Sequence, residues 1–204
     1  MSLQAQEVAR SADVVVRRAI EADLGDVLRV QHEAFRRVAV MAEVDDEHLP
    51  PMQETLADLE SLFAKGVRTF VAVEATGAGE RVVGTVRAAV RADGTVEIGR
   101  LAVATAFLRR GVARALMLAL EADFPESPRF VLFTAADALA PLGLYASLGY
   151  RIFRRQDQEH WTLVWLAKGR ATGACATSTP HPPSAAAQPL PPGQDARYTD
   201  THDS

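Results

Sequence analysis

A short basic stretch, Leu108-Arg-Arg-Gly-Val-Ala-Arg114, has the residue types that most directly suggest chemistry. Three arginines surround Gly111 and Ala113, and the residues that follow are typical of a helix. The first backbone N–H groups of a helix have no partner within the helix and carry a partial positive charge. Small residues at 111 and 113 let those N–H groups approach a phosphate, and the arginines add charge. The stretch therefore predicts an anion site where a helix begins.

Two common phosphate-binding loops do not match this stretch. A Walker A loop requires Gly-Lys followed by Ser or Thr, and the chain contains no such sequence. A dinucleotide-binding loop requires a third glycine, which Gly111-Val-Ala113 lacks, and it follows a parallel sheet. On these residues alone, an ordinary helix with glycine near its N-cap remains open.

The segments around the loop predict the elements that must position it. Runs rich in β-branched residues predict strands at 13–18, 68–75, 81–92, 95–104 and 129–134, and a closing pair within 150–167. The spacing of apolar residues predicts four helices. The first carries Leu24, Val27, Leu28, Phe35 and Val38, and the second carries Leu56, Leu59, Leu62 and Phe63. The third spans 111–124, and a short fourth helix spans 141–148. Together these elements predict an α/β fold with a mixed sheet.

Turn residues refine this order of elements. Asp93-Gly94 predicts a tight hairpin, so the three middle strands should form an antiparallel meander. The strand at 129–134 follows a helix and should pair in parallel. Asp23 is a candidate cap for the first helix, and Gly66 is placed to end the second. The acidic stretch between these helices should be irregular, because Pro50 and Pro51 interrupt it.

Composition bounds the domain and excludes several classes of protein. The chain has 204 residues, of which 48% are hydrophobic, and one domain is predicted over 13–169. Residues 1–12 should be flexible, and residues 170–204, which hold six of the 11 prolines, should be disordered or a proline-rich docking segment. The net charge of -4 disfavours nucleic-acid binding. The single cysteine, Cys175, excludes a disulfide framework and a cysteine-based zinc site. No signal peptide or membrane span is evident, which favours a cytoplasmic protein.

Two motifs together resemble the GNAT superfamily of acetyl-CoA-dependent N-acetyltransferases. The first is Leu101-Ala-Val103 followed by Leu108-Arg-Arg-Gly111-Val-Ala113, which is similar to the family's strand, Arg/Gln-x-x-Gly-x-Gly/Ala loop and helix. The second is Leu144-Tyr145-Ala-Ser-Leu148-Gly149-Tyr150, about 30 residues on. The resemblance covers residues 14–167. It implies a mostly antiparallel central sheet flanked by helices, with two strands that splay apart at the cofactor site.

The resemblance implies that acetyl-CoA binds as cosubstrate along this splayed strand and the loop. The residues expected to bind it are Leu101, Ala102, Val103, Leu108, Arg109, Arg110, Gly111, Val112, Ala113, Arg114, Thr134 and Tyr145. Leu108 occupies the family's usual Arg/Gln position, and Thr105 stands where proline is frequent, which we expect to matter little. An asparagine that often contacts the cofactor has no counterpart near Thr134.

Acetyl transfer to an amine requires a base, a donor for the developing oxyanion and an acid for the departing thiolate. The resemblance implies that the Val103 N–H is the oxyanion donor and that Tyr145 is the acid. Glu97 is the predicted base, because it alternates with Val96 and Ile98 on the strand that leads to the cofactor; an ordinary surface carboxylate remains open. His32 and His160 are weaker candidates for the base.

The acceptor is predicted to be an amine of a small molecule, an amino acid derivative or a protein. Its site should lie between segment 35–60 and the loop joining the last two strands. Acidic residues that could attract a cationic amine there are Glu43, Asp45, Asp46, Glu47 and Glu54. The strands near 150–167, with Trp161 and Trp165, are a candidate edge for a homodimer. The alternative function is an acyl-CoA-binding sensor or interaction domain that has lost catalysis.

Overall fold

The computed structural model describes residues 10–11, 14–46, 49–77, 79–157 and 162–169. These residues belong to one compact unit of the chain. The predictions for residues 1–9, for Cys175 and for the proline-rich segment 170–204 lie outside the described residues. The two-residue strand Arg10–Ser11 pairs with the next strand, so this part of the predicted flexible N-terminus is ordered.

Within the described residues, eight strands form a single sheet in the order β1-β2-β3-β4-β5-β6-β8-β7. Their bounds are β1 Arg10–Ser11, β2 Val14–Arg18, β3 Arg68–Thr76, β4 Gly79–Val90, β5 Val96–Val103, β6 Arg129–Ala135, β7 Arg151–Asp157 and β8 Thr162–Gly169. Neighbouring strands are antiparallel except for β5 and β6, which are parallel. The sheet is therefore mixed and mostly antiparallel, as the sequence predicts.

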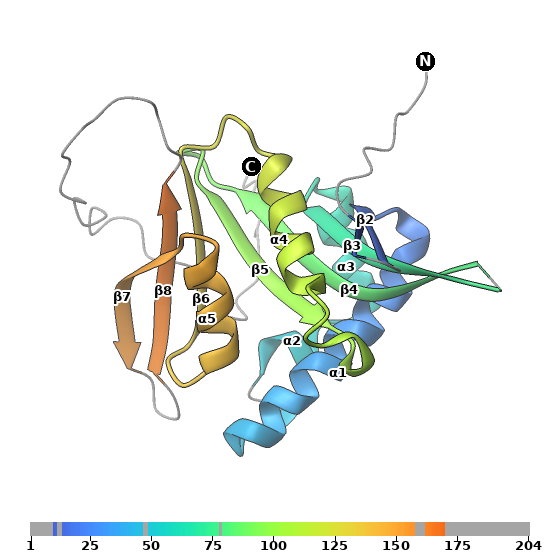
Figure 1. Ribbon diagram of the computed structural model, residues 1–204, viewed down its shortest axis with the longest axis horizontal. Coiled ribbons are helices and arrows are strands. Elements are labelled where there is room, and N and C mark those ends of the chain that lie inside the picture. Colours follow the sequence, from blue (N-terminus) through green and yellow to red (C-terminus); the bar gives the residue numbers. More distant parts are fainter. Residues whose placement is uncertain (1–9, 12–13, 47–48, 78, 158–161, 170–204) are drawn as a thin grey trace, which may run out of the picture. The chain divides into compact units, whose positions relative to one another are not determined.

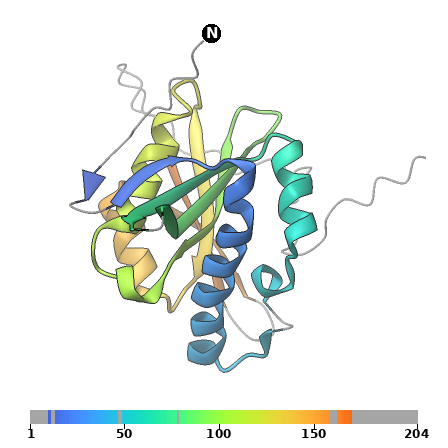
Figure 2. The same cartoon turned by 90° about the vertical axis from the view of Figure 1, so that its right-hand side faces the viewer.

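Helices cover both faces of this sheet (Figures 1 and 2). They are α1 Leu24–Ala42, α2 Pro50–Gln53, α3 Leu56–Ala64, α4 Val112–Ala122 and α5 Leu139–Ser147, with 3-10 turns η1 Glu21–Asp23 and η3 Thr105–Phe107. One buried cluster joins α4 and α5 to the sheet, and a second joins α1 and α3 to the opposite face. Hereafter the two faces are called the α4 side and the α1 side.

The middle of the sheet forms as the turn residues predict. Gly94 adopts a left-handed backbone conformation with φ of 79°, and the Arg91 N–H donates to the Thr95 carbonyl across the turn. The Asp93 carboxylate accepts the Thr95 N–H at 2.9 Å, which closes the turn further. The predicted meander of β3, β4 and β5 is confirmed.

The first helices differ from the sequence prediction in three respects. Pro50 and Pro51 do not break the chain but begin α2, because the missing proline N–H is not required in a first helical turn. Asp23 precedes α1 but does not cap it; its carboxylate accepts the Ile20 N–H and pairs with Arg17. Val38 was predicted on the buried stripe of α1, yet it is 43% exposed, because the end of α1 extends past the sheet.

The last two strands are arranged differently from their order in the chain. β8 inserts between β6 and β7, so β7 rather than β8 is the edge strand. Trp165 lies on β8 and is buried, whereas Trp161 is outside the described residues. β7, within the predicted range 150–167, is thus the edge strand, whereas Trp165 lies on the inner strand β8; the homodimer at this edge stays a prediction.

Candidate functional site

The pairing of β5 with β6 stops partway along both strands. It consists of Val96 opposite Phe130 and Glu97 opposite Val131, although β5 continues to Val103 and β6 to Ala135. The two strands therefore separate beyond Glu97. This is the splayed pair that the family resemblance implies.

The backbone of β5 beyond Glu97 presents hydrogen-bonding groups to the gap. The Ala104 N–H donates to the Val83 carbonyl of β4 at 2.8 Å. Because backbone groups alternate in direction along a strand, those of Leu101 and Val103 point away from β4 and toward the gap. An extended chain lying in the gap can pair with the Leu101 groups and the Val103 N–H as an added strand would, whereas the Val103 carbonyl accepts a hydrogen bond from Arg37.

The loop Leu108–Gly111 leads from β5 into α4 and has two left-handed residues. Arg109 has φ of 63°, and Gly111, the N-cap of α4, has φ of 81°. The left-handed conformation explains the glycine, since it disfavours any residue with a Cβ. No side chain caps the first turn of α4, so its N–H groups can receive an anion.

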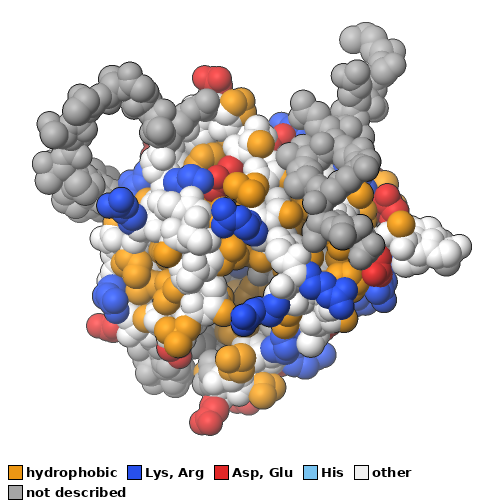
Figure 3. Space-filling view, viewed as in Figure 1, with side chains coloured by type: hydrophobic (Ala, Val, Ile, Leu, Met, Phe, Trp, Pro, Cys, Tyr) orange, Lys and Arg blue, Asp and Glu red, His pale blue; other side chains and the backbone are white. Residues whose placement is uncertain are grey.

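Two arginines at this loop have partners, which the sequence did not reveal. The Arg114 Nη1 donates to the Ser147 hydroxyl at 3.0 Å and so joins α4 to α5. The Arg110 guanidinium lies over the Phe107 ring, 5.1 Å from its centroid. Leu108, at the family's usual Arg/Gln position, is 43% exposed. On this face, basic and apolar side chains surround a hollow between α5 and α4 (Figure 3).

A close approach between β4 and α4 positions the loop. A Cβ added at Gly84 would lie 3.0 Å from side-chain atoms of both Leu116 and Val112. A larger residue at position 84 would therefore require the Leu116 and Val112 side chains of α4 to shift. The sequence analysis did not identify Gly84, because the residues that it contacts are distant in the chain. A glycine within an apolar strand can indicate a close approach of another element, and this is the signal that could have identified it.

Glu97 lies at the vertex of the splay on the α1 side of the sheet. Val96 and Ile98 belong to the core on the α4 side, so the alternating Glu97 faces the opposite way. Arg91 donates to one of its carboxylate oxygens, Oε2, from Nε at 3.0 Å and from Nη2 at 2.8 Å. The side chain is about one-third exposed. The carboxylate is thus held in place by Arg91 and remains open to solvent.

Tyr145 lies on the α4 side, within the core beneath α5. Its ring packs edge-on against Tyr150, with ring centroids 6.0 Å apart. Burial raises the pKa of the Tyr145 phenol to about 12, so the group stays protonated at neutral pH. Thr134, another residue expected to bind the cofactor, is half-buried on β6 beyond the point of separation.

Two side chains of α1 hold the end of β5. The Glu33 carboxylate accepts the Thr105 N–H and the Thr105 hydroxyl, each at 2.7 Å. Arg37 donates to the Val103 carbonyl at 3.2 Å and to the Thr105 hydroxyl. A proline at position 105 has no N–H to donate to Glu33, so this contact is specific to the threonine; the expectation that the replacement of proline matters little for the cofactor stays a prediction.

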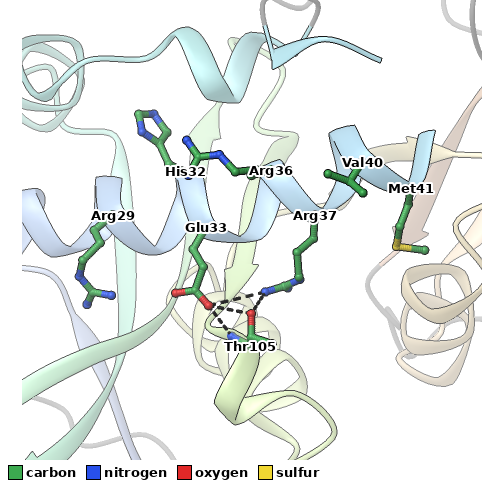
Figure 4. A pocket seen from close by; sticks show the side chains of 8 residues that line it. All are labelled: Arg29, His32, Glu33, Arg36, Arg37, Val40, Met41 and Thr105. Carbon is green, nitrogen blue, oxygen red and sulfur yellow. Dashed lines mark hydrogen bonds and ion pairs between the residues drawn. The ribbon is translucent and has the colours of Figure 1, made fainter. Parts of the chain in front are cut away.

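These contacts form the floor of an open pocket of about 740 Å³ along α1 (Figure 4). It is lined by Arg29, His32, Glu33, Arg36, Arg37, Val40, Met41 and Thr105. In Figure 4, Glu33 and Arg37 point toward Thr105, whereas His32 and Arg36 point to the other side of the helix. The pocket therefore adjoins the end of β5 without entering the gap between β5 and β6.

Glu54, the most buried of the described acidic residues in the predicted acceptor region, is paired with arginines. Glu54 follows α2, and its carboxylate is bound by the guanidiniums of both Arg87 and Arg100. Burial raises the pKa of the Glu54 carboxyl, but the two arginines and their hydrogen bonds outweigh this and lower it overall. Glu54 is therefore an ionised group paired with two arginines, and the attraction of a cationic amine by the acidic residues of this region stays a prediction.

The other candidates in this region are either exposed or outside the described residues. Glu43, Asp45 and Asp46 are exposed, and Asp46 lies 3.7 Å from Arg36. The His32 Nε2 lies 3.1 Å from the Glu54 carbonyl oxygen. Glu47 and His160 lie outside the described residues.

The sequence was compared with protein-family models and with curated proteins. A family model described as the acetyltransferase (GNAT) family matches residues 29–150. A search of curated proteins found no match. None of the described helices combines the length and apolar character that a membrane crossing requires.

Several solved structures share the fold at low sequence identity. The ribosomal-protein-S18-alanine N-acetyltransferase of Escherichia coli is 15% identical, with 76% of this chain and 93% of that chain covered and a TM-score of 0.60. The PaiA N-acetyltransferase of Thermoplasma acidophilum, in complex with coenzyme A, is 12% identical, with 77% and 99% covered and a TM-score of 0.64. YncA of Salmonella typhimurium, a putative acetyltransferase with its cofactor acetyl-CoA, is 19% identical, with 81% and 99% covered and a TM-score of 0.59.

Proposed function

Because the chain belongs to the acetyltransferase (GNAT) family, we propose that it is an N-acetyltransferase that transfers acetyl directly from acetyl-CoA to a primary amine. The observation that carries the proposal is the separation of β5 from β6 beyond Glu97, with an uncapped helix N-terminus at the other end of the gap. The gap presents strand-like backbone groups, and the helix start presents N–H donors. This combination suits a ligand with an extended amide chain and a pyrophosphate.

The residues of the chain fit acetyl-CoA in two places. The backbone groups of Leu101 and Val103 would hold its amide chain, and the loop from Arg109 to Ala113 would hold its pyrophosphate. When bound, acetyl-CoA supplies an acetyl group activated as a thioester. The Val103 N–H would donate to the acyl oxygen as negative charge develops there.

Glu97 and Tyr145 lie on opposite faces of the sheet, which supports direct transfer. The acceptor amine would approach from the α1 side, and Glu97, which stands on that face earlier in β5, would take its proton through intervening water. The new C–N bond forms as the C–S bond breaks. Tyr145, protonated on the α4 side, would give its proton to the departing sulfur. The amine proton would therefore be removed on the α1 side of the sheet, and the thiol proton would be supplied on the α4 side.

Turnover with a panel of amines tests the proposal. The purified protein is incubated with acetyl-CoA and each amine, and both free thiol and the acetylated amine, identified by mass, are measured. Amine-dependent thiol release with an equal amount of acetylated product supports an N-acetyltransferase. Tight binding of acetyl-CoA without any acetylated amine would instead support the sensor or interaction domain, which the unusual Leu108 favours.

A further inference from the structure

A bulge in β5 places an arginine in an uncommon backbone conformation beside Glu97. Arg87 lies opposite Gly99 and Thr85 lies opposite Ala102, so Arg100 and Leu101 together face the single residue between them on β4. Arg100 has φ of 56°, a left-handed conformation that is unfavourable for a residue with a Cβ. A glycine would avoid this cost. The bulge therefore retains a guanidinium at a position where the backbone favours no side chain.

The Arg100 guanidinium contacts a carboxylate that it shares with a second arginine. Its Nη2 and Nε donate to the Glu54 Oε1 at 2.7 and 2.9 Å, while Arg87 donates to Oε2. The fully buried Gln31 also donates to Oε2, at 2.8 Å, and so fixes the carboxylate. The Glu54 carboxylate thus contacts two guanidiniums. Of these, the Arg100 side chain is 23% exposed and the Arg87 side chain 7%, so Arg100 is the one that a ligand can reach.

Open space lies next to Arg100 on the α1 side. Gly99 shares this face with Arg87, its partner across the strand pair, and a Cβ added at Gly99 would meet no atom within 4 Å. β6 has already separated from β5 at this level. Phe133, two residues beyond Val131 and on the same face as it, packs against Trp165 with ring centroids 4.8 Å apart. The space therefore adjoins a guanidinium of β5, and β6 beyond the separation carries aromatic rings on the same face of the sheet.

From these observations, and resting on the proposed function, we propose that the acceptor amine carries a carboxylate group, which Arg100 binds beside the bulge. A guanidinium presents its donors in a planar fork that matches a carboxylate. The site is half-buried, where such a contact is stronger than in bulk water. Glu97 stands three residues away along β5 on the same face of the sheet, so an acceptor whose carboxylate contacts Arg100 would lie on the face that carries the base. Arg100 then determines specificity and takes no part in the proton transfers.

The competing interpretation is that Arg100 serves only to hold Glu54 and the end of α2. A purely structural role would change the turnover of all amines by a similar factor. A recognition role would change the ratio between amines with and without a carboxylate. The ratio is therefore the measurement that separates the two roles.

The test uses paired amines, such as phenylalanine with phenethylamine, tyrosine with tyramine, and 4-aminobutyrate with butylamine. For the wild-type protein we expect kcat/KM to be about tenfold or more higher for the carboxylate-bearing member of a pair, as expected for a hydrogen bond to a charged group. Arg100→Gln should remove this preference mainly by raising KM, and Arg100→Lys should retain part of it. Arg155→Gln, at an exposed position on the edge strand β7, is the matched control and should keep the wild-type ratio.

The outcomes distinguish this inference from the proposed function. Equal kcat/KM within every pair, or a preference that Arg100→Gln retains, overturns the inference and leaves acetyl transfer intact. If no amine is acetylated, calorimetric titration of the same carboxylate-bearing amines into the protein with CoA decides. Binding that Arg100→Gln weakens tenfold or more supports the inference while removing the proposed function. Absence of binding, or equal binding to both proteins, overturns the inference.

Discussion

Glu97 of β5 lies opposite Val131 of β6, and the two strands separate immediately beyond this pair. The carboxylate therefore stands at the vertex of the gap in which the thioester is proposed to lie. Arg91 binds only its Oε2 atom in the contacts described above, which orients the group without enclosing it. A base needs such an orienting partner together with access to the acceptor.

Replacing this carboxylate should slow turnover without weakening cofactor binding. Glu97→Gln retains the shape of the side chain but cannot take a proton, so we expect kcat to fall about a hundredfold or more. The dissociation constant for acetyl-CoA should stay within about twofold, because Glu97 faces the α1 side. Steady-state thiol release and calorimetry measure the two quantities. Glu60→Gln, at an exposed position on α3, is the control, and equal kcat for the two variants would remove Glu97 from the mechanism.

The phenol of Tyr145 should act as an acid over a wide pH range. Its pKa is raised to about 12 by burial, so the protonated form persists to about pH 11, and no alkaline loss of kcat below that pH should come from Tyr145. Tyr145→Phe should lower kcat about tenfold to a hundredfold with unchanged binding of acetyl-CoA. Tyr150→Phe, which removes the neighbouring hydroxyl bound to Glu121, is the matched control. Full activity of Tyr145→Phe would assign the ring to the core alone.

The loop at the start of α4 can be tested with a pair of glycines. Gly111 and Gly66 have nearly equal φ values, 81° and 80°, and a Cβ at either would meet nothing within 4 Å. Gly111→Glu and Gly66→Glu should therefore lose similar stability, about 1–2 kcal/mol, through backbone strain. Only Gly111→Glu should abolish binding of acetyl-CoA, because its carboxylate would stand at the proposed pyrophosphate site. Equal affinities of the two variants in calorimetry would contradict the loop assignment.

The contact between Glu33 and Thr105 should make stability depend on pH in the acidic range. The Thr105 N–H and hydroxyl lower the pKa of the Glu33 carboxyl in the folded protein. The unfolded chain therefore binds this proton more readily, so the stabilisation is present above about pH 5 and is lost as the pH falls through the folded-state pKa. Glu33→Gln should reduce the fall in unfolding free energy between about pH 5 and pH 3, as measured by urea denaturation. An unchanged slope would show that the contact contributes nothing to folding.

The parts of the fold that the sequence predicts are those encoded by neighbouring residues. Asp93-Gly94 encodes its own hairpin, and the spacing of Leu116, Met117 and Leu120 encodes the buried face of α4. The insertion of β8 between β6 and β7 depends on the pairing of β6 with β8, which are separated in the chain by α5 and β7. No local sequence pattern specifies this pairing.

The candidate site shows the same division. The loop around Gly111 is visible in the sequence because its backbone requires glycine. The contacts of Glu33 with Thr105 and of Arg100 with Glu54 join residues 72 and 46 positions apart. Their side chains are common surface types, so only the fold brings them together. For the same reason, the sequence suggests an acidic acceptor region without revealing that Glu54 is paired with two arginines.

The gap between β5 and β6 and the start of α4 are together proposed to bind acetyl-CoA. Calorimetric titration of acetyl-CoA is compared with titration of acetyl-pantetheine, which lacks the pyrophosphate and nucleotide. We expect micromolar binding of acetyl-CoA, a raised Tm in its presence, and affinity about a hundredfold weaker for acetyl-pantetheine. No binding of acetyl-CoA at millimolar concentration, or equal affinity for the two ligands, would contradict this proposal.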